Sequence, residues 1–295
     1  MVTIDSFAEQ KAKDALSLSK FKGVDLSHIK ESLAKMLEHI TDQGMFDQYT
    51  KHDITHIDGM LKLIDDIIPQ SVVGTMTPTD WLMIVFSIYF HDLGMLITHE
   101  EFDNRYESQD YKEFLLSINE SSYEKIDVDK RVRSKYQDYV RVKHGDRIFE
   151  WINSIGDMPD NSHAVKKILY DLLHNLDKRF LKDLALICKS HQEDLQSGIE
   201  DYNIKQQYEQ DINSRVNLLY CAAVLRTADL LHVNSERTPD ISYLIVSPEN
   251  VYSRREWVMQ KSVSCIRPVD EKNRLGVVDS SIEKFRFEII ANFTD

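Results

Sequence analysis

Hydrophobic residues recur at helical spacing in two early segments of the chain. They lie three or four residues apart, on one face of a helix, and so predict amphipathic helices over 25–43 and about 52–68. Ser27 is a candidate cap for the first helix, and Pro69 ends the second. The repeated positions are Ile29, Leu33, Met36 and Ile40 in the first segment and Ile54, Ile57, Leu61, Ile64 and Ile68 in the second.

A third segment, 79–91, is apolar nearly all round, which predicts a central buried helix with Gly94 as its stop. The segment 103–135 is polar and weakly periodic, so we expect an insertion of loops and short helices at the surface. The core is expected to be all-α. Helical periodicity returns over 139–155, 164–176, 181–192 and 212–232.

After Pro239 the pattern changes to short runs that are typical of strands, and we expect a small strand-bearing appendage there. These runs cover 241–246, 263–266 and 285–290. The expected fold class is therefore mostly α, a helical bundle with a small β-containing C-terminal appendage. Its expected parts are N-terminal helices over 1–48 that pack on the core, a core domain over 49–239 and the appendage over 240–295.

The composition narrows the class of protein. Hydrophobic residues make up 42% and charged residues 29% of the chain, which is typical of a globular protein. The most apolar stretch, 81–90, is much shorter than the roughly 20 residues needed to cross a bilayer. Cys188, Cys221 and Cys265 are widely spaced and odd in number, which argues against a disulfide framework or a zinc ribbon and favours a reducing cytoplasm.

The formal net charge of −13 limits the choice of partner. An acidic chain repels polyanions, so binding to nucleic acid would need a local basic groove or metal ions that neutralise the backbone. A small phosphorylated substrate fits this charge without such a groove. We therefore expect a small-molecule partner and no membrane, with nucleic acid disfavoured.

Four residues on predicted helices are candidate metal ligands: His56, the adjacent pair His91 and Asp92, and the distant Asp229. Imidazole and carboxylate groups on facing helices build metal sites in helical bundles. Taken singly, such residues are more often structural histidines or helix caps. His91 and Asp92 are different, because this pair ends the most apolar helix of the chain. Burying two titratable groups there without partners would destabilise the fold by several kcal/mol.

Three segments around these residues resemble the motifs of the HD superfamily of metal-dependent phosphohydrolases. They are YTKHDITHIDGML around His56, SIYFHDLGM around His91 and Asp92, and AAVLRTADLLH around Asp229. The resemblance implies an HD-domain helical bundle in which these four residues hold a first divalent ion. His52, one turn before His56, is a less certain neighbour. The family usually has serine or another small residue after the first histidine, and Ile57 stands there, which weakens the choice of His56 over His52.

The resemblance also implies a second ion. Several members of the superfamily hold one through additional histidines, and His144 in RVKHGDRIFEWI and His191 in LICKSHQEDL occupy the corresponding places. Asp92 would then bridge both ions with one oxygen to each. Gln192 departs from the pattern, because some two-metal members have a second consecutive histidine there, so the number of ions stays open. For both histidines a structural role is the alternative.

Arg226 lies three residues before Asp229, on the same predicted helical face. It is expected either to contact a substrate phosphate or to orient Asp229 through a salt bridge. We count it with Asp92 as a catalytic candidate.

The expected activity is hydrolysis of a phosphomonoester or phosphodiester, on a nucleotide-like substrate, by a metal-activated water. Nitrogen-rich ligation favours manganese, iron, nickel, cobalt or zinc, with magnesium also possible. The alternatives are a nuclease on single-stranded nucleic acid, a non-catalytic metal-bearing regulatory module and, less expected, a di-iron oxygenase. The segment LRTADLLHVNSERTP also resembles an HD subgroup found beside GHKL-type (heat-shock-protein-90-like) ATPase domains in bacterial conflict systems, which would imply an adjoining ATPase domain and a role in bacterial defence.

Overall fold

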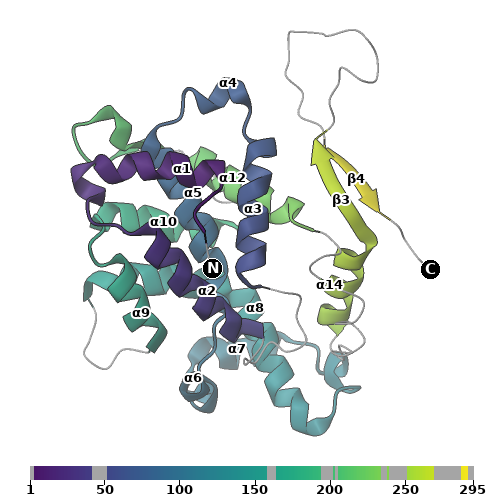
Figure 1. Cartoon of the computed structure of the whole chain (residues 1–295). Helices are drawn as coiled ribbons and strands as arrows, with labels where there is room; N and C mark the ends of the chain where they lie inside the picture. Colours follow the sequence, from purple (N-terminus) through teal and green to yellow (C-terminus); the bar gives the residue numbers. More distant parts are fainter. Residues whose placement is uncertain are drawn as a thin grey trace.

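The computed structural model describes residues 3–41, 52–157, 164–193, 202, 205–233, 238, 251–268 and 287–291. Helices dominate this part of the chain, and its strands form two small antiparallel sheets of two strands each. The predicted fold class, mostly α with a small β-containing part, is confirmed. Figure 1 shows a body of helices with a helix and a strand pair from the C-terminal segment at one side.

The centre of the body is α5 (Pro78–Phe90), the helix predicted over 79–91. Thr77 accepts a hydrogen bond from the backbone of Asp80, and the Asp80 side chain accepts one from the backbone of Thr77, so the helix begins with a capping box. Every residue after Pro78 is buried. The chain continues directly into the 3-10 helix η3 (His91–Met95), so His91 and Asp92 are carried into the middle of the molecule.

Four longer helices surround α5 or η3 and contact one another: α3 (Ile54–Ile67), α8 (Val128–Asn153), α10 (Lys178–Ser190) and α12 (Leu218–Leu231). Each has one apolar face in the common core. Their starts are capped by Asp53, Asp127, Asp177 and Asn217 respectively. Because all four helices border the end of α5, their side chains converge on His91 and Asp92.

The N-terminal helices contact this core. Helix α1 (Phe7–Lys13) lies along α5, and α2 (Leu26–Thr41) contacts α3 and α5 (Figure 1). Two 3-10 turns, η1 (Asp14–Ser17) and η2 (Ser19–Phe21), join them. The buried residues Phe21, Ile29 and Leu33 extend the hydrophobic core into this region.

The predicted insertion over 103–135 is only partly a surface insertion. Short elements fill its first part, as expected: α6 (His99–Asp103), η4 (Arg105–Glu107), α7 (Gln109–Ser117) and η5 (Glu120–Tyr123). Helix α8, however, begins at Val128, well before the predicted start at 139. The hydrophobic pattern did not predict residues 128–138 as helix, because the buried side chains there include Tyr136, Gln137 and Asp138. Ring contacts and hydrogen bonds hold side chains of this kind in place.

The core is helical, as expected, and one short pair of strands lies within it. Strands β1 (Lys205–Gln207) and β2 (Arg215–Asn217) form a hairpin before α12, so the helix predicted over 212–232 begins at Leu218, after η7 (Ile212–Ser214). The smaller remaining elements are α4 (Gln70–Val73), η6 (Ser154–Asp157) and α9 (Ala164–Leu173).

The C-terminal segment holds both a helix and strands. Strands β3 (Val263–Pro268) and β4 (Phe287–Ala291) pair in antiparallel register, close to the predicted runs 263–266 and 285–290. Helix α14 (Val251–Ser262) was not predicted, because its residues show little helical amphipathicity. The predicted strand 241–246 lies outside the described residues. The domain boundary at 239–240 stays a prediction.

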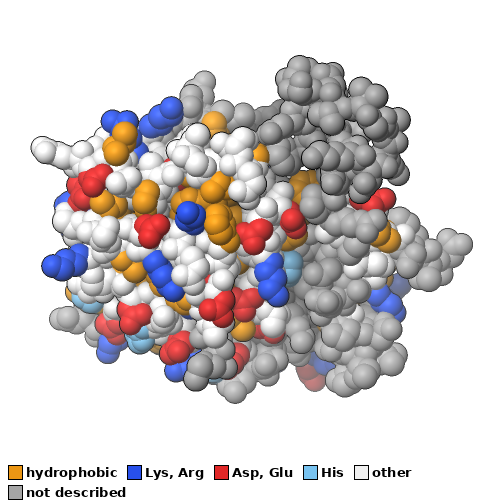
Figure 2. Space-filling model, turned by 45° about the horizontal axis from the view of Figure 1, so that its top comes forward, with side chains coloured by type: hydrophobic (Ala, Val, Ile, Leu, Met, Phe, Trp, Pro, Cys, Tyr) orange, Lys and Arg blue, Asp and Glu red, His pale blue; other side chains and the backbone are white. Residues whose placement is uncertain are grey.

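The surface carries mixed charge. On the face drawn in Figure 2, basic and acidic side chains are interspersed with hydrophobic ones, and no basic track stands out among the described residues there. Among the helices that the structure describes, none combines the length and the apolar character that crossing a bilayer requires.

Candidate metal centre

Five elements bring the six predicted metal ligands together. His56 comes from α3, His91 and Asp92 from η3, His144 from α8 and Asp229 from α12, while His191 is the residue that ends α10. Gly94 allows η3 to approach α8, because a Cβ at this position would overlap the backbone carbonyl of His144. Arg147 joins the same two elements by donating to the carbonyl oxygens of Gly94 and Leu96, each at 2.7 Å.

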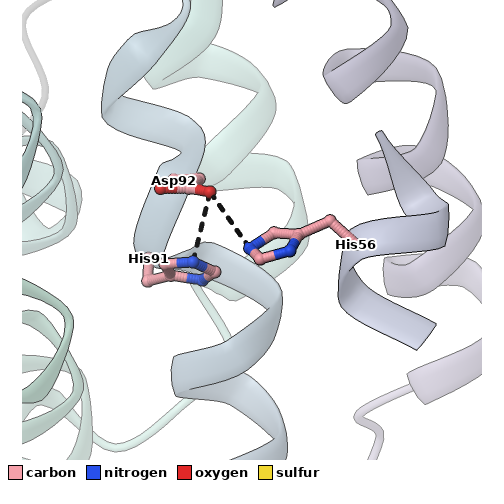
Figure 3. Close-up of side chains that lie close together, drawn as sticks. All are labelled: His56, His91 and Asp92. Carbon is pink, nitrogen blue, oxygen red and sulfur yellow. Dashed lines mark ion pairs between the residues drawn. The ribbon is translucent and has the colours of Figure 1, made fainter. Parts of the chain in front are cut away.

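The first group is formed by His56, His91 and Asp92 (Figure 3), and Asp229 lies near the two histidines. Oδ2 of Asp92 lies 3.5 Å from Nε2 of His56 and 3.2 Å from Nε2 of His91. Oδ1 of Asp229 lies 3.5 Å and 3.9 Å from the same two nitrogens. Ligand atoms that share one ion through bonds of about 2.1 Å lie about 3 to 4.2 Å apart, and the distances from each carboxylate to the two histidines fall in this range. The ligand atoms of His56, His91 and Asp92 all lie within 4.8 Å of one another, whereas Asp229 stands outside this closest group.

The second group is formed by Asp92, His144 and His191. Here the other carboxylate oxygen of Asp92 takes part: Oδ1 lies 3.4 Å from Nε2 of His144 and 4.0 Å from Nε2 of His191. The two oxygens of Asp92 therefore face different pairs of histidines. This is the arrangement in which one carboxylate can bridge two ions.

Hydrogen bonds set the orientation of three of these imidazoles. Nδ1 of His91 donates to the carbonyl oxygen of Ile88 at 2.9 Å, and Nδ1 of His191 donates to that of Cys188, so the proton of these two rings is on Nδ1. In their neutral form the lone pair is on Nε2, which points into the group. Nδ1 of His144 lies 2.8 Å from both the carbonyl oxygen of Arg141 and the amide nitrogen of Gln192, so these contacts admit either tautomer of this ring.

Two features bear on the binding of a cation. Nε2 of His144 and Nε2 of His191 are 2.7 Å apart, which is a hydrogen-bond distance and is shorter than the spacing of two ligands of one ion, so a metal ion would replace the proton between them and separate the two rings slightly. Nε2 of His91 is fully buried and makes no hydrogen bond within the described residues. A buried polar atom of this kind costs about 1–3 kcal/mol, which a metal bond would remove. The imidazole and carboxylate donors suit a first-row transition metal.

The comparison with protein families agrees with this geometry. The family model of HD-CE matches residues 46–286, most of the chain and all of the residues above. The chain belongs to the HD-CE family. No curated protein and no solved structure matches it. The matched range also includes α14 and β3 of the C-terminal segment.

The buried charges of the HD-CE site shift one another's protonation. Burial disfavours the charged form of His91, but the carboxylates of Asp92 and Asp229 outweigh it and raise the pKa of His91 to about 9. Burial likewise raises the pKa values of the two carboxyl groups, but nearby histidines more than reverse this effect. His91 and His144 lower the pKa of Asp92. His56 and His91 lower the pKa of Asp229. The carboxylates are therefore ionised at neutral pH, as ligands must be.

His191 behaves differently from His91. Burial, followed by the charges of His144 and His91, lowers the pKa of His191 to about 3. Its imidazole is thus neutral at physiological pH and ready to bind a cation.

His232 is a residue of the HD-CE site that the sequence analysis did not identify. It is buried at the end of α12, and its Nδ1 lies 2.8 Å from Nδ1 of His56. A Cβ at position 59 would overlap Nε2 of His232, so Gly59 makes room for this ring. The signal was available in the sequence: His232 follows Asp229 by three residues and thus shares its helical face.

Arg226 is placed away from the predicted ligands. Its guanidinium donates to the carbonyl oxygens of Ser190 and Glu193, the latter at 2.5 Å, at the end of α10. These bonds hold the turn that contains His191, which favours a positioning role over contact with a phosphate. The expected role of Arg226 in turnover stays a prediction.

A cavity of about 500 Å³ opens beside the two groups. Asp92, His144, His191 and Asp229 line it, and His52 does so as well. The ring of His52 lies 6.0 Å from that of His56, centroid to centroid, and of these two histidines only His56 belongs to the group with His91 and Asp92. The geometry therefore supports His56, and not His52, as the ligand from α3.

Proposed function

We propose that this HD-CE chain is a hydrolase of phosphate esters that uses two divalent metal ions, with a small nucleotide-like substrate. The observation that carries the proposal is the position of Asp92, whose two oxygens face two separate pairs of histidines beside a cavity of substrate size. Paired metal sites in which one carboxylate serves both ions are suited to clamp the attacking and leaving oxygens of a phosphoryl group.

Each of the two ions would be held by its own set of residues, with Asp92 in both sets. His56, His91, Asp92 and Asp229 would hold the first ion, and Asp92, His144 and His191 the second, in agreement with the distances above. When bound, the ions would polarise a phosphoryl oxygen and lower the pKa of a water to about 7, so that no protein nucleophile is needed. The nitrogen-rich set favours manganese, iron, cobalt, nickel or zinc, with magnesium as a further candidate.

The protein supplies charge compensation and order around the reacting phosphate. The two buried carboxylates balance the positive ions, and the backbone carbonyls at Ile88 and Cys188 hold the imidazoles of His91 and His191 in the binding tautomer. Because the donors are on rigid helices, little reorganisation is needed when a phosphate arrives.

The test is a hydrolysis panel with the purified chain after loading with each of these metals. The panel contains p-nitrophenyl phosphate, bis(p-nitrophenyl) phosphate, nucleoside monophosphates, cyclic nucleotides and single-stranded DNA and RNA. We expect metal-dependent turnover of a small ester that is lost in Asp92→Asn. If no ester is cleaved with any metal, or if Asp92→Asn is as active as the wild type, the proposal is wrong.

The same panel separates the other activities. Preference for single-stranded nucleic acid would indicate a nuclease, oxygen consumption by the iron-loaded chain would indicate an oxygenase, and bound metal without either would indicate a regulatory module. The net charge of −13 and the mixed surface of Figure 2 support a small substrate over a nucleic-acid strand.

An adjoining ATPase of the GHKL type and a role in bacterial defence remain proposals. They are supported by the segment LRTADLLHVNSERTP, which contains Arg226 and Asp229 and resembles the corresponding HD subgroup. Co-purification of such an ATPase with the tagged chain from its native host would support the partnership, and its absence from several independent preparations would contradict it.

A further inference from the structure

The cavity beside the candidate ligands has a wall that comes from the C-terminal segment. Glu256, Met259 and Gln260 of α14 line it together with the ligands from the core. These positions lie on one face of the helix, because they are three and four residues apart. Tyr252, one turn earlier on the same face, packs against Arg141 of α8, with 4.8 Å between the guanidinium carbon and the ring centroid. Helix α14 is thus held against the core at the cavity.

The cavity has apolar lining residues besides polar ones such as Arg141. Met95, Leu230 and Val233 of the core contribute to the apolar lining, and Met259 of α14 does so too. Leu230 is 69% exposed and Met259 is 44% exposed, so the protein leaves both side chains uncovered. A molecule whose phosphate lies at the metal ligands would meet these side chains in the same cavity. They can cover a flat hydrophobic group there.

Glu256 adds a charge to this wall. Its side chain is half-buried and makes no hydrogen bond or ion pair with the part of the chain that the structure describes. A carboxylate accepts hydrogen bonds, so it is suited to hydroxyl or amino groups of a ligand. It also repels a second anionic group that comes near it.

We propose that α14 recognises the organic part of the substrate. Glu256 binds its hydroxyl or amino donors, Met259 covers its apolar face, and the charge of Glu256 disfavours ligands that carry a further phosphate. A phosphate monoester of a nucleoside combines these features within about 500 Å³. This inference rests on the proposed phosphate-ester function, because the phosphate is taken to lie at Asp92, His144, His191 and Asp229.

The experiment compares the binding of adenosine 5′-monophosphate and adenosine 3′,5′-bisphosphate to the manganese-loaded chain by isothermal titration calorimetry, with turnover measured in parallel. The variants are Glu256→Gln and Met259→Ala. Their controls are Glu107→Gln, an exposed glutamate outside the cavity, and Val258→Ala, the exposed neighbour of Met259.

We expect Glu256→Gln to weaken binding of the monophosphate by about tenfold or more, and its preference over the bisphosphate to fall by a similar factor. Met259→Ala should weaken the binding of both ligands, and the two control variants should bind them like the wild type. If both cavity variants bind both ligands like the wild type, or if the wild type binds neither, the role of α14 is wrong. Normal binding with the expected variant effects but without turnover would contradict the proposed hydrolysis and leave the recognition by α14 in place.

Discussion

Oδ1 of Asp92 lies 3.4 Å from Nε2 of His144 and 4.0 Å from Nε2 of His191, while Oδ2 of the same carboxylate faces His56 and His91. The nitrogens of His144 and His191 are themselves 2.7 Å apart, at hydrogen-bond distance. A second ion would replace the proton between them and bind where both nitrogens and Oδ1 of Asp92 converge. These three groups are the structural basis for expecting two ions instead of one.

His191→Ala is therefore expected to lose one ion and keep the other, because His56, His91, Asp92 and Asp229 do not depend on it. Metal per chain, measured by mass spectrometry after loading and desalting, should fall from two to one. His174→Ala is the matched control, since this exposed histidine bonds only the carbonyl of Tyr170 in its own helix among the contacts described. Two ions retained in His191→Ala would remove His191 from the ligand set.

Because His232 contacts His56, removing the His232 ring is expected to lower the affinity of the protein for the first metal ion. Without His232 the imidazole of His56 loses a ring that orients it, and such losses typically reduce metal affinity by about 10- to 100-fold. His232→Ala should show this by calorimetric titration with manganese. Gly59→Ala should act in the same direction, because the added Cβ displaces the His232 ring, whereas Gly74→Ala has open space and should match the wild type. Unchanged affinity in both site variants would refute the positioning role of His232.

Metal binding should release protons and tighten as the pH rises. The pKa of His91 is raised to about 9, so below that pH the ring carries a proton which a cation must displace. For one displaced proton the affinity increases by up to about tenfold per pH unit, and the increase ends near pH 9. Titrations between pH 6 and 8, each in two buffers of different ionisation enthalpy, measure both effects. Affinity that does not change over this range, with no proton released, would contradict the assignment of His91 as a ligand.

A buried ion network ties the N-terminal helices to α3. Nζ of Lys30 lies 2.7 Å from both Oε1 of Glu9 and Oδ1 of Asp58, and the Tyr89 hydroxyl donates to Glu9 at 2.5 Å. Removing one partner leaves a buried charge, so Lys30→Met should lower the free energy of unfolding by about 3–5 kcal/mol in urea titrations. Lys35→Met changes an exposed lysine of the same helix and should have little effect. A loss below about 1 kcal/mol in Lys30→Met would show that the network does not stabilise the fold.

The sequence predicted the parts of the fold whose burial follows a simple period. Helices α3, α5 and α10 have continuous apolar faces and were expected close to where they lie. The first turns of α8 were missed because their buried side chains are tyrosines and polar groups held by specific partners, which a hydrophobic pattern does not register. Helix α14 was missed because its apolar residues do not form a stripe.

Prediction of the site residues from the sequence met the same limit. Residues that resemble a known motif, such as His56 and the pair His91 and Asp92, could be singled out from one sequence. The position of Arg226 on the carbonyls of α10 could not, because helical spacing alone does not tell which neighbouring helix a long side chain reaches. The contact of His232 with His56 joins residues 176 positions apart and needed the packing of α12 on α3.

The central claim is that Asp92 holds both ions, and the metal content of Asp92→Ala tests it most directly. Deleting the carboxylate removes the negative ligand that faces both pairs of histidines, so we expect the wild type to hold two ions per chain and the variant nearly none. Circular dichroism should show the helices intact, because the hydrophobic core is large. A folded Asp92→Ala protein that still contains two ions per chain would contradict the account.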